Sequence, residues 1–233
     1  MEKLYADLAP CWPRLSPVED YDEEAFVYLA LLQNALGGPL ADMLELGSGG
    51  GHLAHHVPAE IPLTLVDLSP QMLALSRSLN PHREHIQGDM RSLRLERTFD
   101  AVLLHDAVTY MTSEDDLAAA LGTVRVHLSP GGVALIAPDF TLETLVPNSS
   151  SVGGGDDARL LEWRHEPVGT TLRIDFAMML RGPDGAVSCV HDTHVQGIFP
   201  FETWFRLLSD AGLELIPLDE HSPTNILFLV RAA

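Results

Sequence analysis

The chain has 233 residues, 46% of them hydrophobic, so it can form one domain with a sizeable core. Lysine and arginine number 14 against 33 aspartates and glutamates, a net charge of -19 that disfavours nucleic acid and anionic membranes as partners. Two distant cysteines, an opening without a signal-peptide pattern and no apolar run near ~18 residues lead us to expect a cytoplasmic protein without a membrane span.

The first half of the chain predicts an alternation of helices and strands. Three prolines in the first 20 residues indicate a short helix and an irregular arm, and residues 21–36 predict a helix that Gly37 ends. Apolar strands are then expected at 41–46, 62–68, 83–89, 99–108 and 131–139, and helices at 52–57, 69–80 and 112–128, with N-caps at Ser69 and Ser113. This pattern predicts a parallel sheet covered on both faces, a doubly wound Rossmann-like α/β fold.

The pattern changes after Pro147. The stretch SSSVGGGDD (149–157) predicts a flexible loop or lid. Three strands within 160–199 are expected to form an antiparallel insertion that extends one edge of the domain, with a hairpin turn at GPDG (182–185). A helix at 201–212 and a hairpin of 213–218 with 225–231 should then close a seven-stranded sheet.

A glycine-rich stretch, ELGSGGGH (45–52), follows the first predicted strand. A phosphate-binding P-loop would need Gly-Lys-Ser/Thr, but Gly51 is followed by His52. A dinucleotide fingerprint would need a glycine at 52, where its third glycine lets helix and strand pack closely. Glu45 also precedes the glycines and would repel a pyrophosphate. The stretch therefore favours a ligand with a positive group.

Carboxylates after the next strands extend this site. Asp67 ends the second predicted strand, where a carboxylate can accept hydrogen bonds from both ribose hydroxyls. Asp89 follows the third strand, where it can accept the amine of an adenine, with Met90 against the ring. We therefore expect a cationic nucleoside without phosphates. Met72 is as consistent with core packing as with a ligand contact, and Gly50 and Gly51 are consistent with merely permitting the turn.

Four segments resemble the class I S-adenosylmethionine (SAM)-dependent methyltransferases in order and spacing: ELGSGGG, LVDLSPQML, IQGDM and HLSPGGVALIAPD. The resemblance implies that SAM is the cofactor and S-adenosylhomocysteine the product. The expected cofactor-binding residues are Tyr5, Trp12, Glu45, Gly47, Ser48, Gly49, Asp67, Leu68, Met72, Asp89, Met90 and His105.

Nearly the whole chain resembles the N,N-dimethyltransferases of amino-deoxysugars such as desosamine and mycaminose, through GHLAHH, QGDMRSLRL, AAALGTVRVHLSPGGV, HDTHVQGIF and LLSDAGLEL. This implies one methyltransferase domain over 1–233, with an arm and helix or lid (1–38), a SAM-binding core (39–147), an antiparallel insertion (148–199) and a final helix and hairpin (200–233). It implies that the insertion covers the substrate and joins two subunits, and that His127 borders the cofactor or acceptor; hydrogen bonding to a loop is the alternative role.

Two departures leave the acceptor open. In this family, basic residues hold the nucleoside diphosphate of the substrate, but the final loop DEHSPTN (219–225) is acidic and lacks an arginine. Arg164 is flanked by acidic residues. The resemblance therefore implies the reaction, methyl transfer to a nitrogen or an oxygen of a small metabolite, but not a nucleotide-sugar substrate.

Candidate catalytic residues lie where strands end. Ligands of doubly wound folds bind at the carboxyl ends of strands, so His105, Asp106 and Tyr110 are well placed. A backbone contact to the methionine part of the cofactor is the alternative for His105. Strand alternation places His194 on one face with Asp192 and Gln196, opposite His191 and Thr193, so His194 is expected to contact the substrate.

Other functions remain open at this stage. Three histidines at 52, 55 and 56 share helical spacing, but no further ligand completes a zinc set, so no metal is expected. An NAD(P)-dependent oxidoreductase and a non-catalytic SAM-binding module are the alternatives to a methyltransferase.

Overall fold

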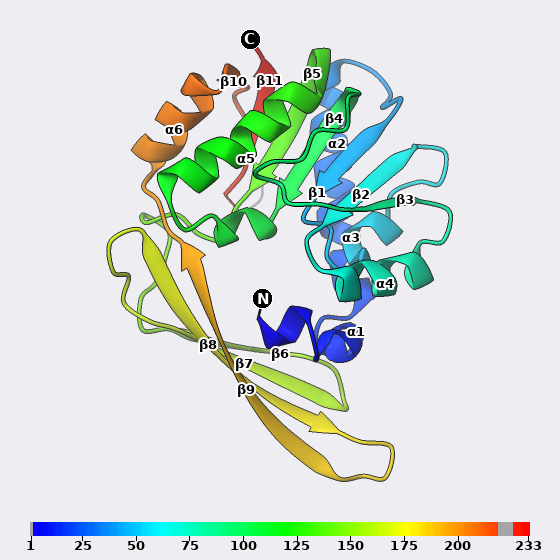
Figure 1. Cartoon of the computed structure of the whole chain (residues 1–233), viewed down its shortest axis with the longest axis vertical. Helices are drawn as coiled ribbons and strands as arrows, with labels where there is room; N and C mark the ends of the chain where they lie inside the picture. Colours follow the sequence, from blue (N-terminus) through cyan, green and yellow to red (C-terminus); the bar gives the residue numbers. More distant parts are fainter. Residues whose placement is uncertain (1, 219–225) are drawn as a thin grey trace.

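The structure is a computed structural model, and it describes residues 2–218 and 226–233. Its main element is a seven-stranded sheet of order β3-β2-β1-β4-β5-β11-β10, in which β1 to β5 are parallel (Figure 1). The strands are β1 Met43–Leu46, β2 Leu63–Asp67, β3 Glu84–Gln87, β4 Phe99–His105, β5 Leu128–Ala137, β10 Leu213–Leu215 and β11 Phe228–Ala232. The predicted doubly wound, seven-stranded fold is confirmed.

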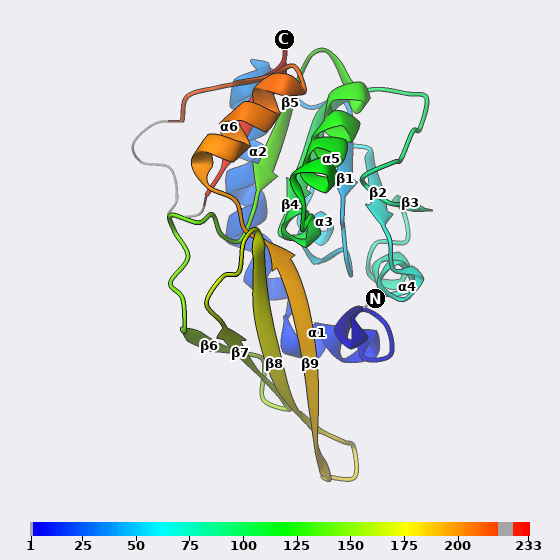
Figure 2. The ribbon, with the colours of Figure 1, turned by 60° about the vertical axis from the view of Figure 1, so that its left-hand side comes forward.

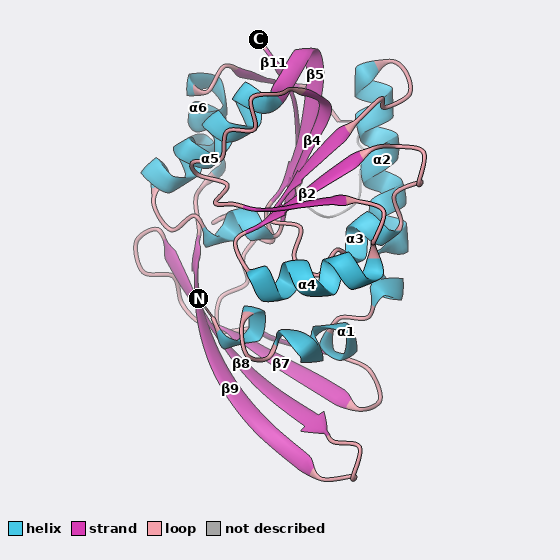
Figure 3. Cartoon of the chain, turned by 45° about the vertical axis from the view of Figure 1, so that its right-hand side comes forward, coloured by secondary structure: helices cyan, strands magenta, loops and turns pink. Residues whose placement is uncertain are grey.

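Helices cover both faces of this sheet (Figure 3). They are α2 Asp22–Leu36, α3 His52–His55 and α4 Pro70–Leu79 on one face and α5 Glu114–His127 and α6 Phe201–Asp210 on the other. Strand β1 is buried along its whole length: Leu44 and Leu46 pack toward α5, whereas Met43 packs toward α2. Burial on both faces removes the polar alternation of a half-exposed strand.

The predicted helix starts are confirmed by their caps. The side chain of Ser69 accepts a hydrogen bond from the backbone N–H of Met72, and that of Ser113 accepts one from Asp116. The helix expected at 52–57 is shorter than predicted: α3 begins at His52 and ends at His55, after about one turn. None of the helices in the described ranges is long and apolar enough to span a bilayer.

The closing hairpin is confirmed: β11 pairs antiparallel with β5 and with β10. It occupies the edge beyond β5, so the insertion adds no strand to the large sheet there. The insertion instead forms a separate antiparallel sheet of order β6-β7-β8-β9. The acidic loop 219–225, which the sequence analysis singled out, lies outside the described residues.

This second sheet has four strands: β6 Ser150–Gly153, β7 Ala158–Arg164, β8 Thr171–Arg181 and β9 Val187–Gly197. The expected flexible loop at 149–157 is therefore partly a strand, because Ser150 to Gly153 pair with Trp163 to Leu160 of β7. The polar, glycine-rich composition predicted a loop, but this edge strand can be polar because all four of its residues are exposed. An exposed edge strand is held by backbone hydrogen bonds and needs no apolar side chains.

The N-terminal arm lies between the two sheets (Figures 1 and 2). It consists of 3₁₀ turns η1 Lys3–Tyr5, η2 Ala9–Cys11 and η3 Val18–Tyr21 and one helical turn, α1 Trp12–Leu15. Leu4 and Leu15 pack against the inner face of β8. The guanidinium of Arg14 donates hydrogen bonds of 2.5 and 2.7 Å to the backbone oxygens of Asp157 and Arg181. The arm is thus fastened to the second sheet.

Candidate active site

A cavity of about 860 Å³ lies between the carboxyl edge of the large sheet, the second sheet and the arm. Its volume is within the usual range of small-molecule sites, about 300–1,000 Å³. Thirteen of the fifteen predicted site residues line it: Tyr5, Trp12, Gly47, Ser48, Gly49, Asp67, Leu68, Met72, Asp89, Met90, His105, Asp106 and Tyr110. The cavity is thus where residues distant in sequence are brought together.

The glycine turn after β1 forms one wall. A Cβ on Gly47 would lie 2.3 Å from the Cβ of Ala107 and 3.0 Å from the Cε of Met90, and its φ of 76° is unfavourable for other residues. A Cβ on Gly51 would instead meet Ser76 and Asn80, at 2.3 and 2.5 Å, on the side of α4. Gly47 therefore lets the chain approach the cavity closely, whereas Gly51 permits the turn.

Asp67 is oriented by the same turn. Its Oδ2 atom accepts a hydrogen bond from the N–H of Gly49 at 2.8 Å, and its Oδ1 atom accepts one from Ser69 at 2.7 Å. Burial raises the pKa of Asp67, although these two bonds oppose the shift. The carboxylate at the end of β2 is thus held rigidly at the cavity wall with its remaining lone pairs available.

Several features of the wall suit a nucleoside that carries a sulfonium. The Oγ atom of Ser48 is buried in the wall and has no hydrogen-bond partner among the described residues. The apolar side chains of Leu68, Met72 and Met90 line the cavity together with Asp67. Both oxygens of Asp89 already accept hydrogen bonds from Arg91. The residues present fit SAM: one carboxylate for the ribose, apolar surface for a base and an unused hydroxyl.

His105 lies between two carboxylates at the end of β4. Its Nε2 atom is 3.3 Å from Oε1 of Glu45, and its Nδ1 atom is 3.5 Å from Oδ2 of Asp106. Burial lowers the pKa of His105, but Asp106 and Glu45 outweigh it, and the pKa is well above its ordinary value. The two neighbouring carboxylates therefore favour the protonated form of His105, which does not suit a role as a base. Glu45 is buried behind His105 and does not line the cavity.

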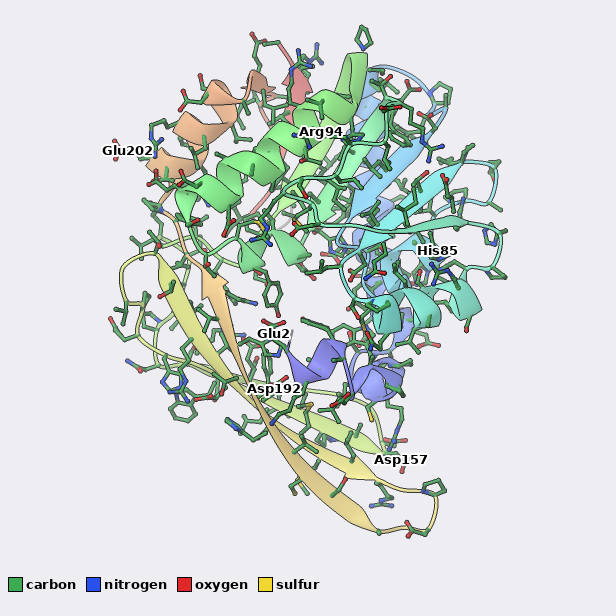
Figure 4. The ribbon with its side chains drawn as sticks, in the orientation of Figure 1. Glu2, His85, Arg94, Asp157, Asp192 and Glu202 are labelled. Atoms are coloured by element: carbon green, nitrogen blue, oxygen red, sulfur yellow. The ribbon has the colours of Figure 1, made fainter. Side chains whose placement is uncertain are left out.

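Tyr110 connects the cavity to a buried histidine. Its hydroxyl oxygen is 2.6 Å from Nδ1 of His194 and 2.9 Å from the hydroxyl of Tyr5. Nε2 of His194 is 3.1 Å from Oδ2 of Asp192, which also accepts a hydrogen bond from the N–H of Leu4. Figure 4 shows Asp192 on β9 beside the arm. His194 is fully buried behind Tyr110 rather than in the cavity wall.

The predicted alternation of β9 is confirmed. Asp192, His194 and Gln196 face inward and are buried. His191 lies on the outer face, where its Nε2 atom is 3.2 Å from Oδ1 of Asp175. The two histidines of the HDTH segment therefore do not act together, because a strand sends residues of odd and even position to opposite faces.

Other histidines hold the framework together. His52 packs against Trp12 and Tyr21 of the arm, with ring centroids 6.2 and 5.6 Å away. His127 lies at the end of α5 and not at the cavity: its Nδ1 atom is bonded to the backbone oxygen of Thr123, and its Nε2 atom accepts from the N–H of Leu95. The loop-bonding role is thus the one observed. Among the described residues no cluster of three metal-ligating side chains occurs.

Among the cavity-lining residues that the sequence did not point to are two acidic ones, Asp139 and Glu162. Asp139 follows β5, just as Asp67 ends β2 and Asp106 follows β4, so its place after a strand was a usable signal. Glu162 carried no such signal, because its position depends on how β7 lies under the large sheet. Burial and the nearby charges of Asp106 and Glu162 raise the pKa of Asp139 well above its ordinary value.

Comparison with known proteins agrees with this geometry. A family model described as a methyltransferase domain matches residues 43–132. A dTDP-3-amino-3,6-dideoxy-alpha-D-glucopyranose N,N-dimethyltransferase of Streptomyces fradiae is 29% identical over 204 residues, covering 84% of this chain and 79% of the relative. A dTDP-3-amino-3,4,6-trideoxy-alpha-D-glucopyranose N,N-dimethyltransferase of Streptomyces venezuelae is 28% identical, covering 75% and 76%.

Solved structures of similar proteins share the whole fold. The crystal structure of Streptomyces venezuelae DesVI superposes with a TM-score of 0.84 at 26% identity, covering 98% of both chains. The sugar N-methyltransferase KedS8 from Streptoalloteichus sp. superposes with a TM-score of 0.79 at 26% identity, covering 97% of this chain and 92% of the other. Together with the glycine turn, Asp67 and the cavity, these similarities support a class I SAM-dependent methyltransferase that resembles the amino-sugar N-methyltransferases.

Proposed function

We propose that the enzyme transfers the methyl group of SAM to the amine nitrogen of an amino sugar. The observation that carries this proposal is the composition of the cavity: a turn and carboxylate suited to SAM face a wall that contains Asp106, Asp139 and Glu162. Carboxylates attract an amine-bearing acceptor. The relatives named above, which act on dTDP-linked amino sugars, support the sugar as the acceptor class.

The cofactor-binding roles follow from the wall residues. Asp67 would accept the ribose hydroxyls, with Leu68, Met72 and Met90 against the adenine and Asp89 near its amine. Gly47, Gly49 and Ser48 would contact the methionine part, with Glu45 and His105 behind it. The arm's Tyr5 and Trp12 would place aromatic faces near the positive charge. When bound, SAM supplies a methyl group activated by its sulfonium.

The side chains around the acceptor favour nitrogen over oxygen. A hydroxyl acceptor needs a base, whereas an amine needs only to be unprotonated. The carboxylates beside His105 favour its protonated form, and burial raises the pKa of the Tyr110 hydroxyl well above its ordinary value, so neither group suits the role of that base. We propose that Asp106 and Tyr110 orient the amine and that His194 holds Tyr110 in place. Positioning of this kind can supply about 7–11 kcal/mol of a barrier.

The test has two stages. Calorimetry should show binding of SAM and S-adenosylhomocysteine and no binding of NAD(H) or NADP(H), which removes the oxidoreductase alternative. Mass spectrometry should then show one or two added methyl groups on an amino-deoxysugar, and none on the matching sugar with a hydroxyl in place of the amine. Absence of SAM binding would overturn the proposal. Binding without turnover on any amine or hydroxyl acceptor would favour a non-catalytic SAM-binding module.

We also propose that residues 1–233 act as one methyltransferase domain and form a homodimer through the second sheet. The outer face of that sheet exposes Leu161, Trp163 and Met179, and such apolar surface commonly marks an interface. Light scattering should give twice the chain mass, and a double variant, Trp163→Glu with Met179→Glu, should give the single mass with its fold intact. A monomeric parent protein would contradict this.

We propose that the enzyme is cytoplasmic and does not bind nucleic acid, on the basis of its free cysteines and its net charge. Cys11 and Cys189 are both free thiols in the structure, as expected in a reducing cytoplasm. The net charge of -19 argues against nucleic acid as a partner. Cell fractionation and a mobility-shift titration with duplex DNA at low salt test these two proposals, and recovery outside the cytoplasm or a shifted band would refute the respective one.

A further inference from the structure

The acceptor side of the cavity is acidic. Asp106 follows β4, Asp139 follows β5 and Glu162 lies on the inner face of β7, and all three line the cavity with Glu2 of the arm. Asp106 has a φ of 44°, a backbone conformation that costs energy in a residue other than glycine. Thr109 donates a hydrogen bond of 3.3 Å to Oδ2 of Asp139. The carboxylates are therefore held in place from different elements.

Positive side chains do not balance this wall. All 14 lysines and arginines of the chain lie within the described residues, and only Arg91 and Arg164 line the cavity. The guanidinium of Arg91 is bound by Asp89 and Asp116, at 2.6 and 3.0 Å. Because it faces two carboxylates, Arg91 is not available to a phosphate group.

Arg164 is also engaged. Its Nε atom is 2.6 Å from Oε1 of Glu162, and its terminal nitrogens donate to the hydroxyls of Ser149 and Ser151. Its guanidinium lies 4.8 Å from the ring centroid of Phe140. A diphosphate in this part of the cavity would have to displace Glu162 from Arg164 and would meet the other carboxylates at short range, where like charges repel most strongly.

The side chain of Gln196 also needs a hydrogen-bond donor from the ligand. Gln196 is 6% exposed and lines the cavity, and its Oε1 atom has no hydrogen-bond partner among the described residues. Buried polar atoms are nearly always paired, and an amide oxygen only accepts. An ammonium or a sugar hydroxyl would satisfy it, whereas a phosphate oxygen would not.

We propose that the acceptor is a cationic amino sugar without phosphate groups, in free or glycosidic form, held by Asp106, Asp139, Glu162 and Gln196. This inference rests on the proposed function and changes its substrate class, because the relatives' names specify dTDP-linked sugars. The carboxylates of this wall attract the ammonium form of the acceptor.

The direct test compares two ligands that share one sugar. Calorimetry on the enzyme saturated with S-adenosylhomocysteine should measure the methyl glycoside of 3-amino-3,6-dideoxyglucose and the dTDP conjugate of the same sugar. We expect the glycoside to bind at least about tenfold more tightly, a difference of roughly 1.4 kcal/mol. Tighter binding of the dTDP conjugate would overturn the inference. Failure to bind S-adenosylhomocysteine would instead refute the proposed function itself.

Two variants test whether the acidic residues of the cavity wall bind the acceptor directly. Glu162→Gln should weaken glycoside binding about tenfold and strengthen binding of the dTDP conjugate, because it releases Arg164. Glu166→Gln is the matched control, since Glu166 lies in the same segment, binds Asn148 and does not line the cavity. Asp139→Asn provides a second variant that should weaken glycoside binding without changing Arg164. If both variants fold and bind the glycoside as the parent does, the inference is wrong.

Discussion

The hydroxyl oxygen of Tyr110 lies 2.6 Å from Nδ1 of His194, although the two residues are 84 positions apart in the chain. The Oδ2 atom of Asp192 is hydrogen-bonded to Nε2 of the same imidazole and accepts a second hydrogen bond from the backbone N–H of Leu4. The carboxylate favours a proton on Nε2, which leaves Nδ1 to accept a hydrogen bond from Tyr110. One buried network thus joins the end of the large sheet, the second sheet and the arm that covers the cavity.

Removing the Tyr110 hydroxyl should destabilise this network. In Tyr110→Phe the buried Nδ1 atom of His194 loses its partner, so we expect the free energy of unfolding to fall by about 1–3 kcal/mol and limited proteolysis to cut the arm faster. Urea denaturation and a protease time course measure the two effects. Tyr21→Phe is the control, because in the described part of the chain its hydroxyl bonds to Ser16 of the arm, at 2.7 Å. Equal effects of the two variants would show that the network does not hold the arm.

The glycine turn predicts a contrast between two alanine variants. Gly47 and Gly37 both have a φ of 76°, so each Gly→Ala change should cost roughly 1–2 kcal/mol of stability. Only at Gly47 would the new Cβ also collide with Ala107, adding about 1–3 kcal/mol and closing the cavity wall. We expect Gly47→Ala to lose at least about tenfold in SAM affinity by calorimetry and Gly37→Ala to retain it. Parent-like SAM affinity in Gly47→Ala would mean that the turn does not approach the cofactor.

Asp67→Ala should weaken SAM binding by roughly 1.5–3 kcal/mol, the range for hydrogen bonds to a charged group. Calorimetry measures the affinity, and circular dichroism checks that the turn still folds without the bonds to Gly49 and Ser69. Asp115→Ala, an exposed change in the first turn of α5, is the control and should leave the affinity unchanged. An Asp67→Ala protein that folds and binds SAM normally would exclude this carboxylate from the ribose site.

His127 predicts a dependence of stability on pH. Burial lowers its pKa, and Nε2 must stay unprotonated to accept the N–H of Leu95. Below the unfolded pKa of about 6.5 the unfolded chain binds a proton at His127 more readily than the folded chain does. The contribution of His127 to the free energy of unfolding therefore decreases as the pH is lowered, by at most ~1.4 kcal/mol per pH unit. The stability difference between the parent protein and His127→Gln should therefore shrink between pH 7.5 and 5.5, as urea denaturation can measure.

His82→Gln is the matched control for this experiment, because it replaces an exposed histidine in the same way. Other histidines also have shifted pKa values: that of His105 is raised, so its contribution to stability is present at low pH and is lost as the pH rises. Comparing each variant with the parent cancels their effects. A difference that stays constant for His127→Gln would place its titration outside this range.

Local patterns were enough for the large sheet and for the cofactor side of the cavity. Continuous apolar strands, the caps at Ser69 and Ser113 and the spacing from Gly47 to Asp67 depend on residues close in sequence, and the structure bears out the strands and caps. In a parallel sheet the strands all end at one edge, so residues that follow them, such as Asp67 and Asp106, meet there regardless of distance along the chain.

The acceptor side was decided by tertiary structure alone. Glu162 and Gln196 reach the cavity because the insertion forms its own sheet below the carboxyl edge, and His194 lies behind Tyr110 rather than in the wall. Strand alternation determines which residues share a face, but it does not determine what that face packs against. The sequence by itself therefore determined the fold and which residues at strand ends meet at the carboxyl edge, whereas the packing of the second sheet and the arm decided which charges surround the cavity.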